Sequence, residues 1–301
     1  MPAWLLLALL SPVLFASVNC LEKFIVDRSR TSIYHYVAWV GVFDALIGVV
    51  VLAAASGQGV DGRAYLGGWL SGTMVSVSLV LYLVALRMGQ VTRVIPVWYL
   101  NPLMVAPMAA AFLDERISLL AVLAIVLAVM GGVLVSWQGG GKESRSFGNP
   151  VPILLALGAA VFMAVSIVLA KEFLETDTFW QFFGVYRLGV ATVMLWTFAL
   201  PQVRGAPAAA LRSPTFMGMV IAAEALVTLS LIARNGAINL GPVSLVAAVS
   251  SVQPTVVFLY SLLLARLLPS RFGHWLVAGT IRPQVAGIAA ITAGVVIISL
   301  Q

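Results

Sequence analysis

The sequence predicts an all-α integral membrane protein with ten transmembrane helices, arranged as two inverted repeats of five helices each. Three observations predict this fold class. The chain is 61% hydrophobic and only 9% charged, whereas soluble domains carry about 25% charged residues. Ten apolar stretches come close to the roughly 20 residues that a helix needs to cross a bilayer core. The fourth and ninth of these stretches share residues in the same order.

Short connections join the predicted helices, so helices that are neighbours in sequence are expected to pack together. The predicted spans are 3–21, 33–55, 64–86, 92–112, 117–137, 151–170, 179–200, 215–236, 242–267 and 283–300. The first span lacks a basic segment before it, which favours a retained helix over a signal peptide. The stretch QGGGKESRSFGNP has the composition of a linker. The predicted units are therefore 1–137, a linker at 138–150, and 151–301.

The fourth and ninth predicted helices have matching sequences. GQVTRVIPVWYLNP at 89–102 aligns without a gap with GPVSLVAAVSSVQP at 241–254. LALLSPVLFASVNCLEK at 7–23 aligns in the same way with LALGAAVFMAVSIVLAK at 155–171. Because each unit has an odd number of helices, the second unit must cross the membrane in the opposite sense. Inverted repeats of this kind are typical of secondary transporters.

Two carboxylates are predicted near the middle of a span, Asp44 and Glu224. A charge at a helix centre costs about 2.5–3.5 kcal/mol on insertion scales, so it usually faces a cavity or a partner. Glu224 shares a helical face with Thr228 and Asn235, which favours binding of substrate or a proton over simple pairing with a neighbouring helix. For Asp44, whose flanks are apolar, pairing is the favoured interpretation. Arg187 is expected to neutralise one of these acids or to meet an anionic substrate.

The matched helices supply the remaining candidate site residues. Pro102 and Pro254 each free a backbone carbonyl one turn earlier and, with Pro96, Gly89 and Gly241, are candidate hinges. Polar and aromatic side chains of the third, fourth and ninth helices are candidates for the wall of a binding cavity: Asn101, Gln253, Trp98, Tyr99, Ser78 and Tyr82. Packing and lipid contacts are the alternative interpretation for the aromatic members.

Three stretches resemble the EamA-like family of the drug/metabolite transporter superfamily. They are RMGQVTRVIPVWYLNP leading into FLDERIS, NLGPVSLVAAVSSVQP leading into LLLARLLP, and GGVLVS at the end of the first unit. The resemblance covers nearly the whole chain. It implies a central cavity lined by helices 1–4 and 6–9, with helices 5 and 10 at the periphery, and movement of a small metabolite, often outward.

One departure from this family concerns acidic residues. The family often has a Gly-Glu pair after both the fourth and ninth helices. Here Asp114-Glu115 follows the fourth helix, but Ala265-Arg266 follows the ninth. The charged pairs Glu22-Lys23 and Lys171-Glu172 at corresponding helix ends are either gate charges or interfacial groups that reach toward water.

We therefore predict a secondary transporter that exports a small polar or amphipathic metabolite by alternating access, with proton coupling as an option. A lipid or lipid-carrier flippase on the same fold and a non-transporting membrane scaffold or receptor are the alternatives. The chain has no phosphate loop of the GxxxxGKS or GxxxxGKT type and no HExxH or GxSxG motif, so we expect neither an enzyme nor a cofactor nor a bound metal.

The expected partners are the small-molecule substrate and the lipid bilayer, with the chain a monomer or a homodimer. The net charge of +6 comes from loop residues, which argues against nucleic-acid binding. A bacterial or archaeal cytoplasmic membrane is the expected location. Lys and Arg are concentrated in the odd-numbered loops, so the positive-inside rule places both termini outside, whereas the family habit places them inside.

Overall fold

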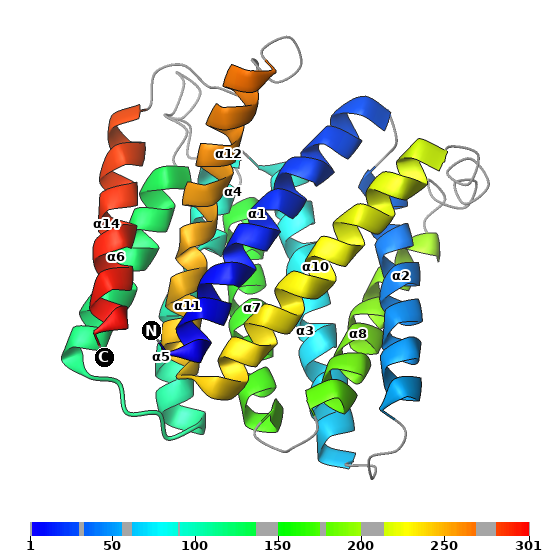
Figure 1. The fold of residues 1–301 in the computed structure, drawn as a ribbon, viewed down its shortest axis with the longest axis horizontal. Coiled ribbons are helices and arrows are strands. Elements are labelled where there is room, and N and C mark those ends of the chain that lie inside the picture. The colour runs from blue at the N-terminus through cyan, green and yellow to red at the C-terminus, as the bar shows by residue number, and fades with distance from the viewer. Residues whose placement is uncertain are drawn as a thin grey trace.

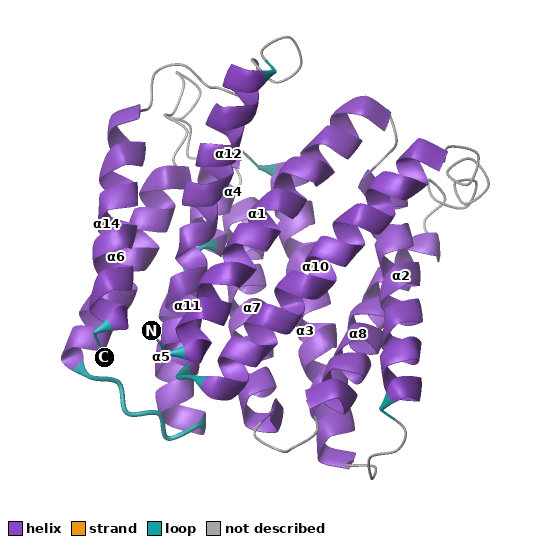
Figure 2. Cartoon of the chain, in the orientation of Figure 1, coloured by secondary structure: helices purple, strands orange, loops and turns teal. Residues whose placement is uncertain are grey.

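The computed structural model describes residues 2–29, 33–55, 62–89, 91–136, 150–174, 179–199, 214–268 and 281–300. These residues form helices joined by short connections, and none of them is drawn as a strand (Figures 1 and 2). The described part of the chain has 10 helices long and apolar enough to cross a membrane. All ten predicted spans are confirmed, with boundaries that differ from the predicted ones by a few residues. The protein is a multi-pass integral membrane protein.

The first half of the chain forms five of these spans. Its helices are α1 (Ala3–Ser29), α2 (Ile33–Ala54), α3 (Gly62–Met88), α4 (Val91–Trp98), α5 (Asn101–Phe112) and α6 (Leu119–Ser136). The fourth span consists of two segments, α4 and α5. Nearly all of the predicted linker, 138–149, lies outside the described residues.

The second half forms the other five spans, and its ninth span is also interrupted. Its elements are α7 (Val151–Leu174), α8 (Phe179–Leu195), a 3-10 turn (Trp196–Ala199), α10 (Pro214–Leu240), α11 (Val243–Val249), the 3-10 turn η3 (Ser250–Val252), α12 (Gln253–Leu267) and α14 (Ile281–Ser299).

The interruptions of the fourth and ninth spans follow from proline. Pro102 and its counterpart in the ninth span have no N–H, so each leaves a carbonyl four residues earlier without its helical donor. The carbonyl of Trp98 accepts a 3.0 Å hydrogen bond from the side-chain amide of Asn101. In the ninth span the chain tightens, and the N–H of Gln253 reaches the carbonyl of Ser250. Side chains and tighter turns thus satisfy the freed groups inside the membrane.

Helices from opposite halves of the chain pack against each other. The contacting pairs include α1 with α10, α3 with α7, α2 with α8, and α6 with α14, the last pair lying together at one side of the bundle (Figure 1). Gly131 and Gly287 face each other in the α6–α14 pair. A Cβ atom added at Gly131 would lie 2.6 Å from the carbonyl oxygen of Gly287. The missing side chains therefore allow the close backbone approach that helices in lipid use for packing.

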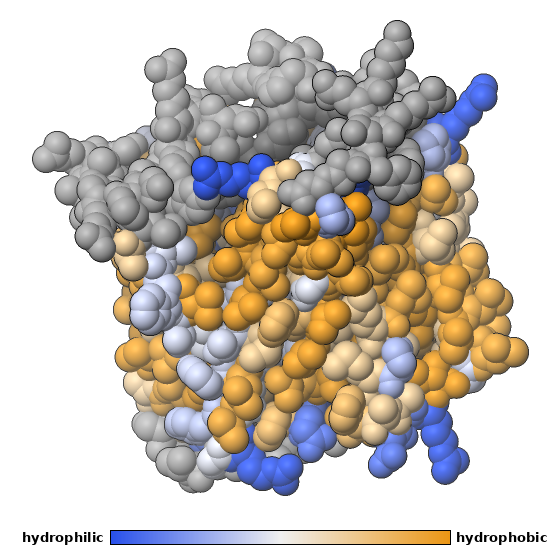
Figure 3. Space-filling model, turned by 180° about the vertical axis from the view of Figure 1, so that it is seen from behind, coloured by the Kyte–Doolittle hydropathy of each residue, from blue (hydrophilic) through white to orange (hydrophobic). Residues whose placement is uncertain are grey.

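The outer surface is apolar around the middle of the bundle. Figure 3 shows hydrophobic side chains across the central part of one face, with hydrophilic residues toward the two ends. Large exposed apolar residues occur on many helices, among them Leu46, Leu120, Leu154 and Leu263. Such a surface would aggregate in water, whereas the hydrocarbon core of a bilayer covers it without cost.

Candidate functional site

A cavity of about 250 Å³ lies inside the helix bundle. Its wall is built from α1, α2, α3, the end of α4, the turn between α4 and α5, α5, α7, α8, α10, η3 and α12. No described residue of α6 or α14 contributes to the wall. The cavity therefore has the arrangement implied by the family resemblance, with spans 1–4 and 6–9 around it and spans 5 and 10 outside it.

Much of the wall is apolar, and its polar groups are few. Phe15, Val75, Leu79, Met163 and Ile167 are among the apolar lining residues. The ionisable side chains of the wall come from four helices and are Glu22, Asp44, Arg187, Glu224 and Arg234, besides the phenols of Tyr99 and Tyr186. A wall of this kind suits a small molecule with an apolar body and a few polar groups.

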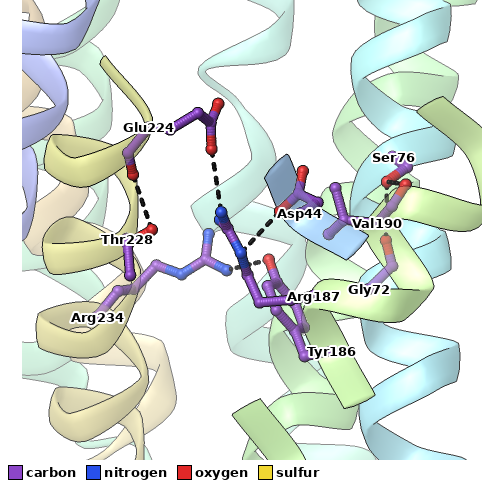
Figure 4. Close-up of polar contacts among 9 residues, drawn as sticks. All are labelled: Asp44, Gly72, Ser76, Tyr186, Arg187, Val190, Glu224, Thr228 and Arg234. Carbon is purple, nitrogen blue, oxygen red and sulfur yellow. Dashed lines mark hydrogen bonds and ion pairs between the residues drawn. The ribbon is translucent and has the colours of Figure 1, made fainter. Parts of the chain in front are cut away.

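Arg187 on α8 holds two carboxylates from two other helices (Figure 4). Its Nε atom lies 2.7 Å from Oδ1 of Asp44 on α2. Its Nη2 atom donates a 3.0 Å hydrogen bond to Oε2 of Glu224 on α10. The three side chains are at most 3% exposed. The sequence predicted that Arg187 would neutralise one of these acids, and the structure shows it paired with both.

This buried triad of Asp44, Arg187 and Glu224 is not electrically balanced. With all three groups ionised, it carries two negative charges and one positive charge. Removing ions from water costs several kcal/mol each, and ion pairing offsets this cost only where the charges balance. The second oxygen of Glu224, Oε1, is buried and has no hydrogen-bond partner among the described residues. The triad is therefore suited to accept one additional positive charge at Glu224.

A second arginine of the wall, Arg234, lies on α10 nearer its C-terminal end than Glu224. Nη2 of Arg234 donates a 2.9 Å hydrogen bond to the phenol oxygen of Tyr186 on α8 (Figure 4). Arg234 lies two residues before the end of the predicted eighth span, 215–236, and the sequence indicated no role for it in the cavity. In the structure α10 continues to Leu240, so Arg234 lies inside the helix and on the cavity wall.

Comparison with known proteins supports this architecture. Residues 2–137 match the model of the EamA-like transporter family, part of the drug/metabolite transporter superfamily. The match lies in the first half of the chain, and this segment is named the EamA-like unit after the similarity. No curated protein matches the sequence significantly. A solved structure described as "Crystal structure of protein" has a TM-score of 0.75 and 17% sequence identity, with 99% of this chain and 96% of that chain covered. At this identity the likeness shows the fold alone.

The EamA-like unit places most of the predicted residues of its fourth span on the wall. Trp98, Tyr99, Asn101 and Pro102 line the cavity, as does Gln253 of the second half. The rings of Trp98 and Tyr99 lie 5.4 Å apart between centroids. Their part in substrate binding stays a prediction.

Two hydroxyl groups predicted for the wall lie elsewhere. Ser78 of the EamA-like unit is buried and donates a 2.6 Å hydrogen bond to the carbonyl of Ala159, so it belongs to the α3–α7 contact. Thr228 donates at 2.7 Å to the backbone carbonyl of Glu224 and thus bonds its own helix (Figure 4). Neither residue is part of the cavity wall. Because neither side chain lines the cavity, their roles in substrate binding stay predictions without a supporting contact.

The remaining aromatic and polar candidates also lie behind the wall. Tyr82 packs against Trp98, with 4.7 Å between ring centroids. Asn235 is fully buried, and its amide has no hydrogen-bond partner among the described residues. The wall face of α10 runs instead through Glu224, Val227, Leu231 and Arg234. It is rotated from the polar face that the sequence indicated.

The candidate hinge residues occupy corresponding places in the two halves. A Cβ atom added at Gly89 would lie 2.5 Å from Pro152 at the start of α7, and one added at Gly241 would lie 2.5 Å from Trp4 at the start of α1. Pro96 and Pro254 are buried and lie outside the wall. The hinge function of these residues stays a prediction.

A contact between the two halves lies outside the cavity wall. The Glu115 carboxylate, in the connection between α5 and α6, accepts a 3.2 Å hydrogen bond from the N–H of Val243 and another from the hydroxyl of Ser244. Both donors lie at the N-terminus of α11, where Pro242 provides no side-chain cap. In the sequence Glu115 stands out as part of an acidic pair that the second half lacks, but its contact with the start of α11 could not be predicted.

Proposed function

We propose that the protein is a secondary transporter that exports a small polar or amphipathic metabolite by alternating access, with a proton as the coupling ion. The observation that carries this proposal is the buried triad of Asp44, Arg187 and Glu224 on the wall of a central cavity. Charged groups inside a membrane are costly and mark substrate and ion pathways. The EamA-like character of residues 2–137 independently favours transport.

Two matching hydrogen bonds, each of which joins one half to the other, support the inverted repeat on which alternating access depends. Ser78 on α3 donates to the carbonyl of Ala159 on α7, and Ser230 on α10 donates to the carbonyl of Ser11 on α1. Ser230 follows Ser78 at the spacing that separates the matched glycines. Ala159 follows Ser11 at the spacing that separates the two aligned first helices. Replacing each residue of one hydrogen bond by its counterpart in the other half therefore gives the second hydrogen bond, as a two-fold repeat requires.

The triad supplies a step for proton coupling. When Glu224 is ionised, its Oε2 is held by Arg187 at 3.0 Å. A proton on Glu224 removes this charge, so the guanidinium keeps only Asp44 as an ionic partner and the α8–α10 link weakens. Proton binding from one side and release to the other would thereby bias the two packings of the helices that surround the cavity.

The first experiment is a transport assay in reconstituted vesicles. Candidate cargoes, namely amino acids, nucleosides, sugars and cationic drugs, are first screened by their effect on thermal unfolding of the purified protein. Transport of each stabilising compound is then measured with and without an imposed pH gradient. We expect wild-type protein to accumulate cargo only when the gradient is present.

The decisive variant is Glu224→Gln, compared with Glu172→Gln as a matched control. Glu172 is 43% exposed and lies at the end of α7, outside the cavity wall. We expect E224Q to express and fold normally and to lose accumulation driven by the pH gradient, while E172Q retains it. Gradient-driven accumulation by E224Q at the wild-type rate would reject the coupling role of Glu224.

A further inference from the structure

The cavity wall contains a third carboxylate, Glu22, which belongs to neither the triad nor the membrane surface. Ser11, Phe15, Asn19 and Glu22 line the cavity at spacings that place them on one side of α1. Glu22 is the last wall residue before the end of this helix. Of the two interpretations of Glu22, a gate charge or an interfacial group that reaches toward water, its position on the cavity wall favours the first. The side chain of Lys23, its predicted companion, lies outside the described residues.

Among the described residues, Glu22 has a neutral partner. Its Oε1 accepts a 2.9 Å hydrogen bond from the phenol of Tyr36 on α2, and it makes no ion pair with any described residue. The two arginines of the wall are engaged elsewhere, since Arg187 holds Asp44 and Glu224 while Arg234 bonds Tyr186. The wall thus has three carboxylates and two guanidinium groups among its described residues.

The surroundings of Tyr36 hold the Glu22 carboxylate in place. Tyr36 is only 7% exposed and packs in an apolar cluster with Ile25 of α1 and Phe216 of α10. Its ring therefore has little freedom, and its hydroxyl presents a fixed donor to the carboxylate. A carboxylate that is positioned in this way, without a counter-ion in a mostly apolar wall, is costly unless a cation reaches it.

We infer that Glu22 is the cation-binding residue of the cavity and takes up either a proton or the ammonium group of a cargo molecule. This inference rests on the proposed transport function and adds to it a site separate from Glu224. The triad contains its own guanidinium, whereas Glu22 has no cationic partner among the described residues and can be compensated by a positive group that enters the cavity. Glu22 also occupies the end of the α1 wall face, so an entering cation meets it at the margin of the cavity.

Other ionisable groups share the cavity with Glu22 or stand near it. They are Tyr36 and Asp44 on α2, Tyr82 on α3, Tyr99 in the turn before α5, Arg187 and Tyr186 on α8, and Glu224 and Arg234 on α10. A test must therefore separate the Glu22 signal from the signals of these groups. Variants of single carboxylates provide this separation.

The test compares wild type, E22Q, E22D, Y36F and the exterior control E172Q in detergent. Infrared difference spectra between acidic and alkaline buffer report protonated carboxyl groups. Isothermal titration calorimetry with ethylammonium and tetramethylammonium at constant alkaline pH reports cation binding. Circular dichroism and thermal unfolding establish that each variant is folded.

We expect E22Q to lose one of two signals that wild type and E172Q both show. Loss of one titrating carboxyl band identifies the proton, and a tenfold or greater loss of ammonium affinity identifies the cargo group. E22D should keep the signal with altered strength, and Y36F should alter it without removing it. Retention of both signals in folded E22Q overturns the inference. If cations bind at Glu22 but no compound crosses the bilayer, the transport proposal fails and the Glu22 site remains.

Discussion

Replacing Arg187 with glutamine is the sharpest test of the buried triad. The substitution removes the positive charge that lies 2.7 Å from Asp44 and 3.0 Å from Glu224. Breaking a buried ion pair by removal of one partner costs about 3–5 kcal/mol, because the other charge stays buried without compensation. Here two carboxylates lose their only cation, so we expect a loss at the upper end of that range.

Two companion variants separate charge balance from the loss of hydrogen bonds. E224Q keeps the pair of Asp44 and Arg187 and brings the charge sum of the triad to zero. We expect it to lose less than the approximately 1.5–3 kcal/mol of a hydrogen bond to a charged group. The triple variant D44N/R187Q/E224Q has no charge left, and neutral replacements of buried ionic groups are often tolerated. It should therefore be more stable than R187Q alone, although inactive.

The assay is thermal unfolding of each purified variant in the same detergent, repeated after reconstitution in lipid. The expected order of stability is wild type, E224Q, the triple variant and R187Q, with the largest gap before R187Q. Equal unfolding midpoints for R187Q and wild type would contradict the reasoning, because an unpaired carboxylate couple cannot be buried without cost.

Three further predictions concern other parts of the molecule. Gly131→Leu should lower the free energy of unfolding by about 1–3 kcal/mol, because the added side chain would meet the backbone of α14 near Gly287. Leu120→Ala, at an exposed position, serves as its control in the same unfolding assay. Glu115→Gln should weaken the contact with α11, so that a cysteine placed at Val243, which keeps both hydrogen-bond donors to Glu115, reacts faster with a water-soluble maleimide than it does with Glu115 intact; equal labelling rates would argue that Glu115 does not hold the start of α11. Arg234→Met should lower the affinity for cargo in the screen without a loss of folding, because Arg234 is a charged wall residue whose hydrogen-bond partner, Tyr186, is neutral; unchanged affinity would exclude direct contact with cargo.

The sequence was most informative where a physical requirement leaves few options. A helix in lipid must be long and apolar, so all ten spans could be predicted from hydropathy. Arg187 was expected to meet an acid because an arginine near the middle of a span needs a counter-charge. Pro102 and Pro254 were expected to free a carbonyl one turn earlier, since proline removes a helical donor, and the fourth and ninth spans are interrupted at these places.

Glu22 was missed as a wall residue because the predicted first span ended at 21, whereas Arg234 lay just inside the predicted eighth span, 215–236, and was given no cavity role. An apolar window ends where charged residues begin, so it marks the part of a helix that lipid can surround rather than the helix end. In the structure α1 continues to Ser29 and α10 continues to Leu240. A charged residue near such an end can face an internal cavity instead of water. Only the packing of neighbouring helices decides between these two directions.

The face of α10 was misjudged because periodicity identifies polar positions but not their partners. Thr228 lies one turn after Glu224 and was expected beside it on the wall. Its hydroxyl can instead satisfy a backbone carbonyl of its own helix, and it does so at 2.7 Å. A hydroxyl whose hydrogen bond is satisfied within its own helix needs no polar surroundings. Its position in the sequence therefore does not predict which face of the helix lines a cavity.

If the protein alternates between two orientations, as proposed, the contact of Glu115 with α11 would make them unequal in energy. The Glu115 carboxylate bonds the start of α11, while the corresponding stretch 254–268 of the second half contains no acidic residue. A hydrogen bond to a charged group contributes about 1.5–3 kcal/mol, which corresponds to a preference of roughly ten- to hundredfold. The empty molecule would then wait mostly on one side of the bilayer, and its unloaded return, not the passage of cargo, would limit turnover.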